Sequence, residues 1–564
     1  MAPGVSRRAW LARQTALWGA ASPRWRWGLD APRRVTRGGH GPSVGTTAER
    51  VDPGPMQVLA LRAVEAARSA GATYADARLT REVMHVFDMQ GVGGRVFQVR
   101  EEIGVGVRAL VDGAWGFASS FYWDPDAVVR MARDAVAQAK DNATGAAGTV
   151  ELGQVPVVTG RWETPIGIDP FTIPIEEKFA AFVEWKVCAE RAGCPIEGGG
   201  SYNTLTFIRQ ERVLATSEGT LVTQTLHRSG GDIRCTLGGH RGLEAFLPCD
   251  TPAGQGWERF AQIPAQVDAM HDALQAQAAI EDRGRPVDAG RTTVVCDGAT
   301  MAALLGCTLG IATQLDRALG YEANAGGTSF LDDPLAMVGH LPLASPLVTV
   351  TANRTAPTQL ATVQWDDEGV VPQPFTLVKD GVLVDFQTTR EQAAWLAPYY
   401  QSHDWPVHSN GCAAAQDANC IPMQMLPNLS LEPSASAIGL EDLVKDVETG
   451  LLIENGFAGC DFQARTGRLW VPDRDWVGVN MRKITKGVVG ERLHGGSILF
   501  ATRDLWTHVV AVGGETTVGG QAYSDWIESG SSNSPPDKGE PAQATPFSVR
   551  AAAATITNQP VTTA

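Results

Sequence analysis

Residues 97–120 read FQVREEIGVGVRALVDGAWGFASS, and this stretch decides the fold of the first part of the chain. Two mainly apolar runs, residues 107–111 and 115–118, lie on either side of Asp112-Gly113. An Asp-Gly pair between two such runs is typical of a two-residue turn that joins antiparallel strands. The stretch therefore predicts a β-hairpin.

The segments around this hairpin complete an α/β module. Residues 56–71 carry apolar side chains along one face at helical spacing, and residues 74–80 alternate in the manner of a strand. After the hairpin, Asp124-Pro125 opens a second helix that runs to about Lys140, with proline in its first turn.

The rest of the chain divides at two connecting stretches, residues 141–165 and 282–291. The patterns predict helices at residues 174–192, 268–279 and 301–319. They predict strands at residues 202–237, 292–296, 347–351, 374–385, 469–471 and 497–512.

These boundaries give an expected fold class and four expected regions. The fold class is α+β, with an N-terminal α/β module followed by a largely antiparallel β module. Because 564 residues are too many for one ordinary core, several domains are expected. The regions are a basic tail (1–55), the α/β module (56–145), a middle region (146–290) and a β-rich C-terminal module (291–564).

Composition excludes two classes of partner. The formal net charge of −15 argues against a nucleic-acid surface, which needs clustered cations. No stretch approaches the roughly 20 apolar residues that a membrane span requires. The nine cysteines contain no C-x-x-C pair, so reduced and mostly buried thiols are expected.

The first 55 residues differ from the rest because they are basic and nearly free of acidic residues. Residues 6–11 (SRRAWL, Ser6 to Leu11), followed by a short apolar stretch, look like a twin-arginine export signal. The alternatives are a disordered basic tail or a misplaced start codon. We expect a cytoplasmic protein, or an exported one if this signal works.

Six fragments, taken in order, resemble the TldD/PmbA family of zinc metallopeptidases, also called modulators of DNA gyrase. They are YADAR at 74–78, GVGVR at 104–108, TSEG at 216–219, LGYEAN at 319–324, DDEGV at 366–370 and KGEP at 538–541. The resemblance implies dimers, some of them pairing an active chain with a zinc-free one. It also implies an enclosed cleft in which an extended peptide is cleaved.

Active members of the family carry His-Glu-x-x-x-His on a helix, and a later cysteine completes the metal site. Two imidazoles one helical turn apart can share a zinc ion, and the glutamate can activate its water. Alignment through the neighbouring fragments places the ligands and the glutamate on Gly306, Cys307, Ile311 and Pro536. These residues form a degenerate metal site, because Gly, Ile and Pro side chains offer no donor atom.

Two other groups of residues are candidate sites. His403, His408, Cys412 and Cys420 share one segment, but their spacing fits no standard zinc pattern, and ordinary loop residues are favoured. The acidic cluster of Asp366, Asp367 and Glu368 could line a cleft and do acid–base or metal chemistry. A structural role, in which it binds backbone amides and cations, is favoured.

The predicted function is that of a family homologue in proteolysis and peptide processing. We expect a non-catalytic subunit, without a cofactor of its own, that completes the peptide cleft of a zinc-bearing partner. The alternative is an active peptide hydrolase with an unrecognised site. A homodimer or heterodimer with a chain of the same family is expected.

Overall fold

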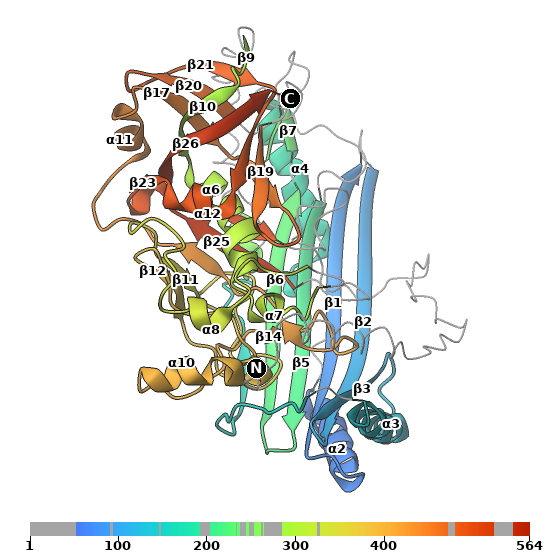
Figure 1. Cartoon of the computed structure of the whole chain (residues 1–564). Coiled ribbons are helices and arrows are strands. Elements are labelled where there is room, and N and C mark those ends of the chain that lie inside the picture. The colour runs from blue at the N-terminus through green and yellow to red at the C-terminus, as the bar shows by residue number, and fades with distance from the viewer. Residues whose placement is uncertain are drawn as a thin grey trace.

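The computed structural model describes most of the chain from residue 52 onward. The described residues are 52–90, 94–145, 148–191, 204–232, 234–236, 244–246, 253–260, 263, 285–323, 327–471, 480–523 and 545–563. A tall sheet of long strands forms one layer, and the C-terminal half packs against one of its faces (Figure 1).

The tall sheet has six strands in the order β3-β2-β1-β5-β6-β4. They are β1 (Tyr74–Gln90), β2 (Gly94–Val111), β3 (Ala114–Ser120), β4 (Thr159–Glu163), β5 (Thr204–Thr216) and β6 (Leu221–Asp232). All neighbours are antiparallel except β4, which is parallel to β6. Strands from residues 56–145 and from residues 146–290 therefore share one sheet.

The expected hairpin joins β2 to β3. Asp112 and Gly113 both have positive φ, at 48° and 76°. This pair of left-handed residues matches the right-handed twist of the flanking strands, which is why Asp-Gly suits the turn.

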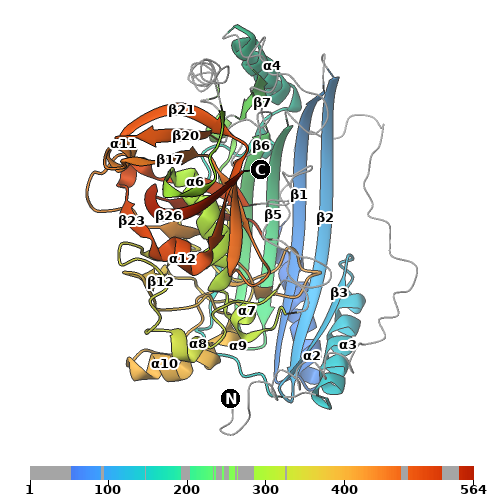
Figure 2. The same ribbon diagram turned by 45° about the horizontal axis from the view of Figure 1, so that its top comes forward.

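Helices lie at both ends of the tall sheet (Figure 2). At one end are α2 (Gly54–Ser69) and α3 (Pro125–Ala143), and at the other is α4 (Ile175–Arg191). The side chain of Asp124 caps α3 by accepting hydrogen bonds from the amides of residues 126 and 127, and Pro125 follows it. The expected helices over 56–71, 124–140 and 174–192 are confirmed to within a few residues.

Strand β1 is buried on both faces over residues 74–80, and the two faces differ in chemistry. One face is apolar and packs with α2 and α3 in a common core through Ala75, Ala77 and Leu79. The intervening positions are polar and face the C-terminal half: Asp76, Arg78 and Thr80. Alternation along the strand thus separates an apolar face from a polar face.

The C-terminal half contains two larger sheets. A ten-stranded sheet comprises β9 (Arg285–Pro286), β10 (Gly290–Cys296), β17 (Thr449–Glu454), β18 (Phe457–Cys460), β19 (Thr466–Val471), β20 (Asn480–Thr485), β21 (Val488–His494), β22 (Gly496–Ala501), β23 (Val509–Val512) and β26 (Ala554–Thr563). A six-stranded sheet comprises β11 (Val350–Ala352), β12 (Phe375–Lys379), β13 (Val382–Leu383), β16 (Leu429–Leu431), β24 (Gly519–Tyr523) and β25 (Phe547–Ala551).

Most strand pairs in these sheets are antiparallel, as expected, and only β10–β17, β21–β9 and β16–β25 are parallel. Helix α6 (Gly298–Leu305) contacts strands of both sheets. Two short ladders are formed by β14 (Ala413–Ala414) with β15 (Met423–Gln424) and by β7 (Arg234–Thr236) with β8 (Glu244–Phe246).

The remaining helices are short. They are α7 (Leu315–Leu319), α8 (Pro334–Met337), α9 (Arg390–Ala393), α10 (Ala397–Ser402), α11 (Leu440–Lys445) and α12 (Thr502–Thr507). Single turns of 3-10 helix are η1 (Pro170–Thr172), η3 (Trp257–Phe260), η5 (Ala394–Leu396) and η6 (Glu515–Thr517). The helix expected at 268–279 lies outside the described residues.

Residues 301–319 were expected to form one helix, and this prediction is wrong. Helix α6 continues into a π-helical turn, η4 (Gly306–Gly310), and the chain then breaks before α7. Gln314 is extended, with ψ at 119°, and forms an isolated bridge with Gln387. The Gln387 side chain also donates a hydrogen bond of 2.7 Å to the carbonyl of Gly310. These long-range contacts interrupt the helix.

Residues 497–512 were expected to be mainly β, and this is correct for their two ends but wrong for their middle. Helix α12 separates β22 from β23 and places Trp506 in the core, where it is 0% exposed. Its indole nitrogen donates a hydrogen bond of 3.0 Å to the hydroxyl of Thr308. A buried tryptophan needs such a partner, and the helical turn brings it there.

Candidate functional site

The positions aligned with the metal motif are closely packed. A Cβ atom on Gly306 would lie 2.9 Å from the hydroxyl oxygen of Tyr523, and one on Gly310 would lie 2.6 Å from Leu429 Cδ1. Tyr523 is itself held by stacking on Phe547, with ring centroids 4.7 Å apart. Ile311 is 2% exposed. No room is left for an imidazole at position 306 without displacement of its neighbours.

These residues do not fit a catalytic zinc ion. Of Gly306, Cys307 and Ile311, only Cys307 has a donor atom, whereas a catalytic zinc normally has three protein ligands. In the part of the chain that the structure describes, no three His, Cys, Asp or Glu side chains are grouped to hold a metal ion. Pro536, the fourth aligned position, and residues 6–11 lie outside the described residues.

Cys307 has a neighbour that the sequence analysis missed. Its thiol donates to the backbone carbonyl of Leu304 at 3.6 Å and also contacts the thiol of Cys460, at the end of β18. Both cysteines are free thiols in the structure. Sequence spacing gives no signal for this pair, because the two residues come from distant segments.

The four residues weighed as a replacement metal site have separate environments. His403 lies against the rings of Tyr399 and Trp405, and His408 stacks on Tyr400. Cys412 is fully buried, and the backbone carbonyl of Cys420 accepts from Arg78. The segment is thus held by aromatic and backbone contacts.

The acidic cluster lies between the tall sheet and the C-terminal half, and its carboxylates are buried. Asp366 accepts hydrogen bonds from the amides of Glu368 and Val370, both at 2.9 Å, and of Ala413 at 3.2 Å. Burial and the neighbouring Glu368 carboxylate raise the pKa of Asp366 to about 7. Its backbone partners close the turn around Gly369, whose φ is 80°.

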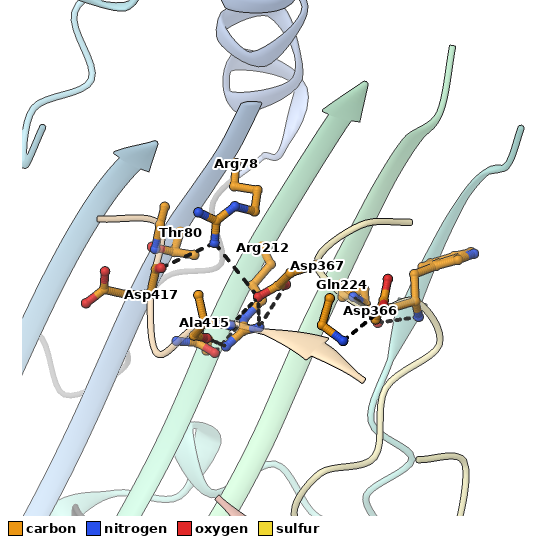
Figure 3. A network of polar contacts seen from close by, with 12 residues as sticks. Arg78, Thr80, Arg212, Gln224, Asp366, Asp367, Ala415 and Asp417 are labelled. Atoms are coloured by element: carbon orange, nitrogen blue, oxygen red, sulfur yellow. Dashed lines mark hydrogen bonds and ion pairs between the residues drawn. The ribbon is translucent and has the colours of Figure 1, made fainter. Parts of the chain in front are cut away.

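Asp367 binds two cations that project from the tall sheet (Figure 3). Its carboxylate lies 3.2 Å from Arg212 Nη1 and 3.8 Å from Arg78 Nη1, and accepts from the amide of Ala415 at 2.7 Å. Burial alone would raise the pKa of Asp367, but Arg212, Arg78 and the Ala415 amide hold it below its usual value.

Glu368 completes a second set of ion pairs across the same interface. Its carboxylate accepts from Arg108 Nη1 at 3.3 Å and from the amide of Arg390 at 2.9 Å. Arg108 also pairs with Asp76 at 2.7 Å. Arg390 makes a two-pronged contact with Glu218, in which both N–O distances are 2.8 Å.

Four of the fragments quoted from the sequence therefore meet at one place. YADAR supplies Asp76 and Arg78, GVGVR supplies Arg108, TSEG supplies Glu218 and DDEGV supplies the acidic cluster. The cluster binds backbone amides and cations, which is the structural role that the sequence favoured. We call this set of ion pairs, which are buried except at Glu218, the polar layer.

A small pocket lies within the polar layer. Its lining combines charged and neutral polar side chains with apolar ones: Arg78, Leu79, Thr80, Arg212, Val213, Leu214, Val222, Gln224, Asp366, Asp367 and Asp417. Sequence reasoning missed Arg78, Arg212 and Gln224 as site residues. For Arg78 the available signal was the alternation of polar and apolar residues over 75–80, whereas Arg212 and Gln224 lie in runs of consecutive polar residues that give no such signal.

The fold and the two regions just described define a class: a two-part protein whose halves meet across buried ion pairs, and in which Cys307 alone offers a donor atom among the aligned positions that the structure describes. The sequence matches two family models, the PmbA/TldA metallopeptidase C-terminal domain over residues 289–537 and the PmbA/TldA metallopeptidase domain 1 over residues 92–139. The chain belongs to the PmbA/TldD metallopeptidase family.

One curated relative and two solved structures are similar to this chain. A metalloprotease of Methanocaldococcus jannaschii is 22% identical over 368 residues, which cover 65% of this chain and 73% of the relative. TldE from Thermococcus kodakarensis superposes with a TM-score of 0.60 at 14% identity, covering 90% of this chain and 99% of that one.

A Thermotoga maritima protein named as a candidate modulator of a DNA gyrase gives a TM-score of 0.62 at 12% identity, with 90% of this chain and 100% of that one covered. At these identities the two solved structures establish the fold. No helix within the described ranges is long and apolar enough to cross a membrane.

Proposed function

We propose that this chain is a non-catalytic subunit that completes the peptide cleft of a zinc-bearing partner from the same family. One observation carries the proposal: the aligned motif positions that the structure describes are closely packed, while the polar layer joins the two halves. A Cβ atom at Gly306 would meet Tyr523, and Ile311 is 2% exposed. Such a chain keeps the architecture of the family without a residue set for metal chemistry.

The proposed ligand is an extended peptide, and the proposed assembly is a dimer with the partner. Main-chain hydrogen bonds to a sheet edge hold a peptide of almost any sequence. In this assembly the partner supplies the zinc ion and its water, and this chain supplies one wall of the cleft. The ion pairs of the polar layer would keep that wall rigid, because Arg108 and Arg212 of the tall sheet pair with Glu368 and Asp367 of the C-terminal half.

Co-expression tests the proposal. The chain is co-expressed with the zinc-motif homologue of highest similarity from the same genome, and the products are examined by size exclusion, elemental analysis and a peptidase assay. We expect one complex whose zinc is accounted for by the partner alone. The complex cleaves unfolded peptides that neither chain cleaves by itself.

The matched control replaces the first motif histidine of the partner with alanine, which should abolish cleavage without loss of the complex. Two results contradict the proposal. In the first, the chains elute separately and the homologue alone is fully active. In the second, this chain alone binds about one zinc ion and cleaves peptides, which would establish the alternative of an active hydrolase.

A further inference from the structure

Cys307 and Cys460 lie where helix α6 and strand β18 run beside one another. At the start of α6, the carboxylate of Asp297 accepts from the amide of Asn455 at 3.0 Å. Further along, the hydroxyl of Thr300 accepts from the amide of Gly456 at 2.8 Å. The helix and the segment leading into the strand are thus anchored to each other before the chain reaches either thiol.

The two thiols meet beyond these anchors. Cys307 belongs to the π-helical turn η4, which follows α6 directly, and Cys460 is the last residue of β18. Their side chains are hydrogen-bonded to one another. Because the backbone on both sides is already fixed, the contact between the sulfur atoms costs little further ordering.

The two thiols differ in access. Strand β18 is an edge strand of the ten-stranded sheet, and Cys460 is partly exposed. The turn that follows it is open to solvent, with Phe462 66% exposed. Cys307 is 9% exposed and lies behind it. A reagent from solution can therefore reach Cys460 first.

The two thiols also differ in acidity. The hydrogen bond with Cys307 lowers the pKa of the Cys460 thiol against the opposing effects of burial and the Asp461 carboxylate, and the positive charge of Arg317 adds a smaller lowering. The same hydrogen bond, together with burial, raises the pKa of Cys307. The less buried member is thus the better thiolate, and the thiolate is the form that attacks a disulfide.

We propose that Cys460 and Cys307 form a thiol–disulfide site that takes low-molecular-weight disulfides as its oxidant. The Cys460 thiolate attacks one sulfur of the oxidant RSSR, and RS⁻ leaves and takes up a proton. The Cys307 thiol then loses its proton and attacks the Cys460 sulfur, releasing the second RSH. Two thiols are oxidised to one disulfide, and one RSSR is reduced to two RSH.

Formation of this bond would tie η4 to β18 at the place aligned with the metal motif. The site does not depend on the proposed function, because it rests on the two thiols of this chain alone. The proposed disulfide would add a covalent bond between two segments that are otherwise joined by hydrogen bonds and packing.

The test uses the full-length chain, reduced and then treated with oxidised glutathione under native conditions. We expect an intramolecular disulfide, detected as a peptide containing Cys307 joined to Cys460, which dithiothreitol reverses. Cys307→Ser should stop the reaction at glutathione attached to Cys460. Cys460→Ser should prevent both products at these positions. The control is Cys188→Ser, which removes a free and partly buried thiol of α4 and should leave the cross-link intact.

Circular dichroism confirms that each variant is folded before treatment, and trapping with iodoacetamide provides a second measurement on the wild-type chain. Cys460 should be alkylated faster than Cys307. The proposal is overturned if the folded wild-type chain forms no Cys307–Cys460 peptide, or if Cys307 is the residue that carries glutathione when Cys460 is replaced.

Discussion

At the scale of single residues, one side chain of the polar layer can bind groups from two distant parts of the chain. Asp367 holds two guanidinium groups from the tall sheet and one amide from the C-terminal half. A buried ion pair contributes little when compared with apolar packing, but removal of one partner leaves an unpaired charge. The cost of substitution is therefore high.

Asp367→Asn should lower the free energy of unfolding by about 3 kcal/mol at neutral pH, because Arg78 and Arg212 keep their buried charges and lose their counter-charge. Urea titration followed by fluorescence measures the difference. The control is Asp380→Asn, the same chemical change at an exposed turn residue whose φ is 48°. Asparagine tolerates that conformation, so the control should stay within about 0.5 kcal/mol of wild type.

The same variant has a pH signature with a defined sign. The pKa of Asp367 is lowered in the folded chain, so the unfolded chain takes up this proton first as the pH falls. The stabilisation is complete above the unfolded value of about 3.9 and is lost as the pH falls through the folded pKa. The gap between wild type and Asp367→Asn should therefore shrink in acid. A gap that widens on acidification would contradict this assignment.

At the scale of elements, the sequence pattern correctly predicted those helices and turns that depend on residues close in sequence. The hairpin at Asp112-Gly113 and the capped helix after Asp124 are set by residues close in sequence, and both were predicted correctly. The break in residues 301–319 and the insertion of α12 depend on Gln387 and Thr308, which are distant in sequence. The periodicity of apolar residues within a short segment gives no information on contacts with residues that are distant in sequence.

The π-helical turn η4 gives a prediction at this scale. Gly306→His restores the first histidine of the family motif, but its side chain must displace Tyr523, which is stacked on Phe547. Overpacking of this kind should lower the free energy of unfolding by about 2 kcal/mol. Gly145→His is the control, because a Cβ atom at Gly145 meets no atom within 4 Å. Equal stability of the two variants would show that η4 has room for a ligand.

At the scale of the whole molecule, the sequence predicted the α+β class and the family, but not how the two halves join. The quoted fragments were recognised one by one. That four of them meet in the polar layer follows only from the strand pairing, which brings β1, β2 and β5 together. Residues such as Arg212 and Gln224 were missed because a polar residue on a strand normally faces solvent, whereas here it faces the other half of the protein.

This arrangement predicts that neither half is stable alone. The tall sheet buries Arg78, Arg108 and Arg212 against anions and carbonyls of the C-terminal half. A fragment of residues 52–288 would expose this face and leave these cations without those partners, and a fragment of residues 289–564 would leave the acidic cluster without its cations.

We expect the full chain to unfold in one cooperative transition. Each fragment alone should show no sigmoidal transition in urea, and mixing the two should restore part of the signal. If both fragments unfold cooperatively at the midpoint of the full chain, the halves are independent domains and the polar layer is only a contact between them.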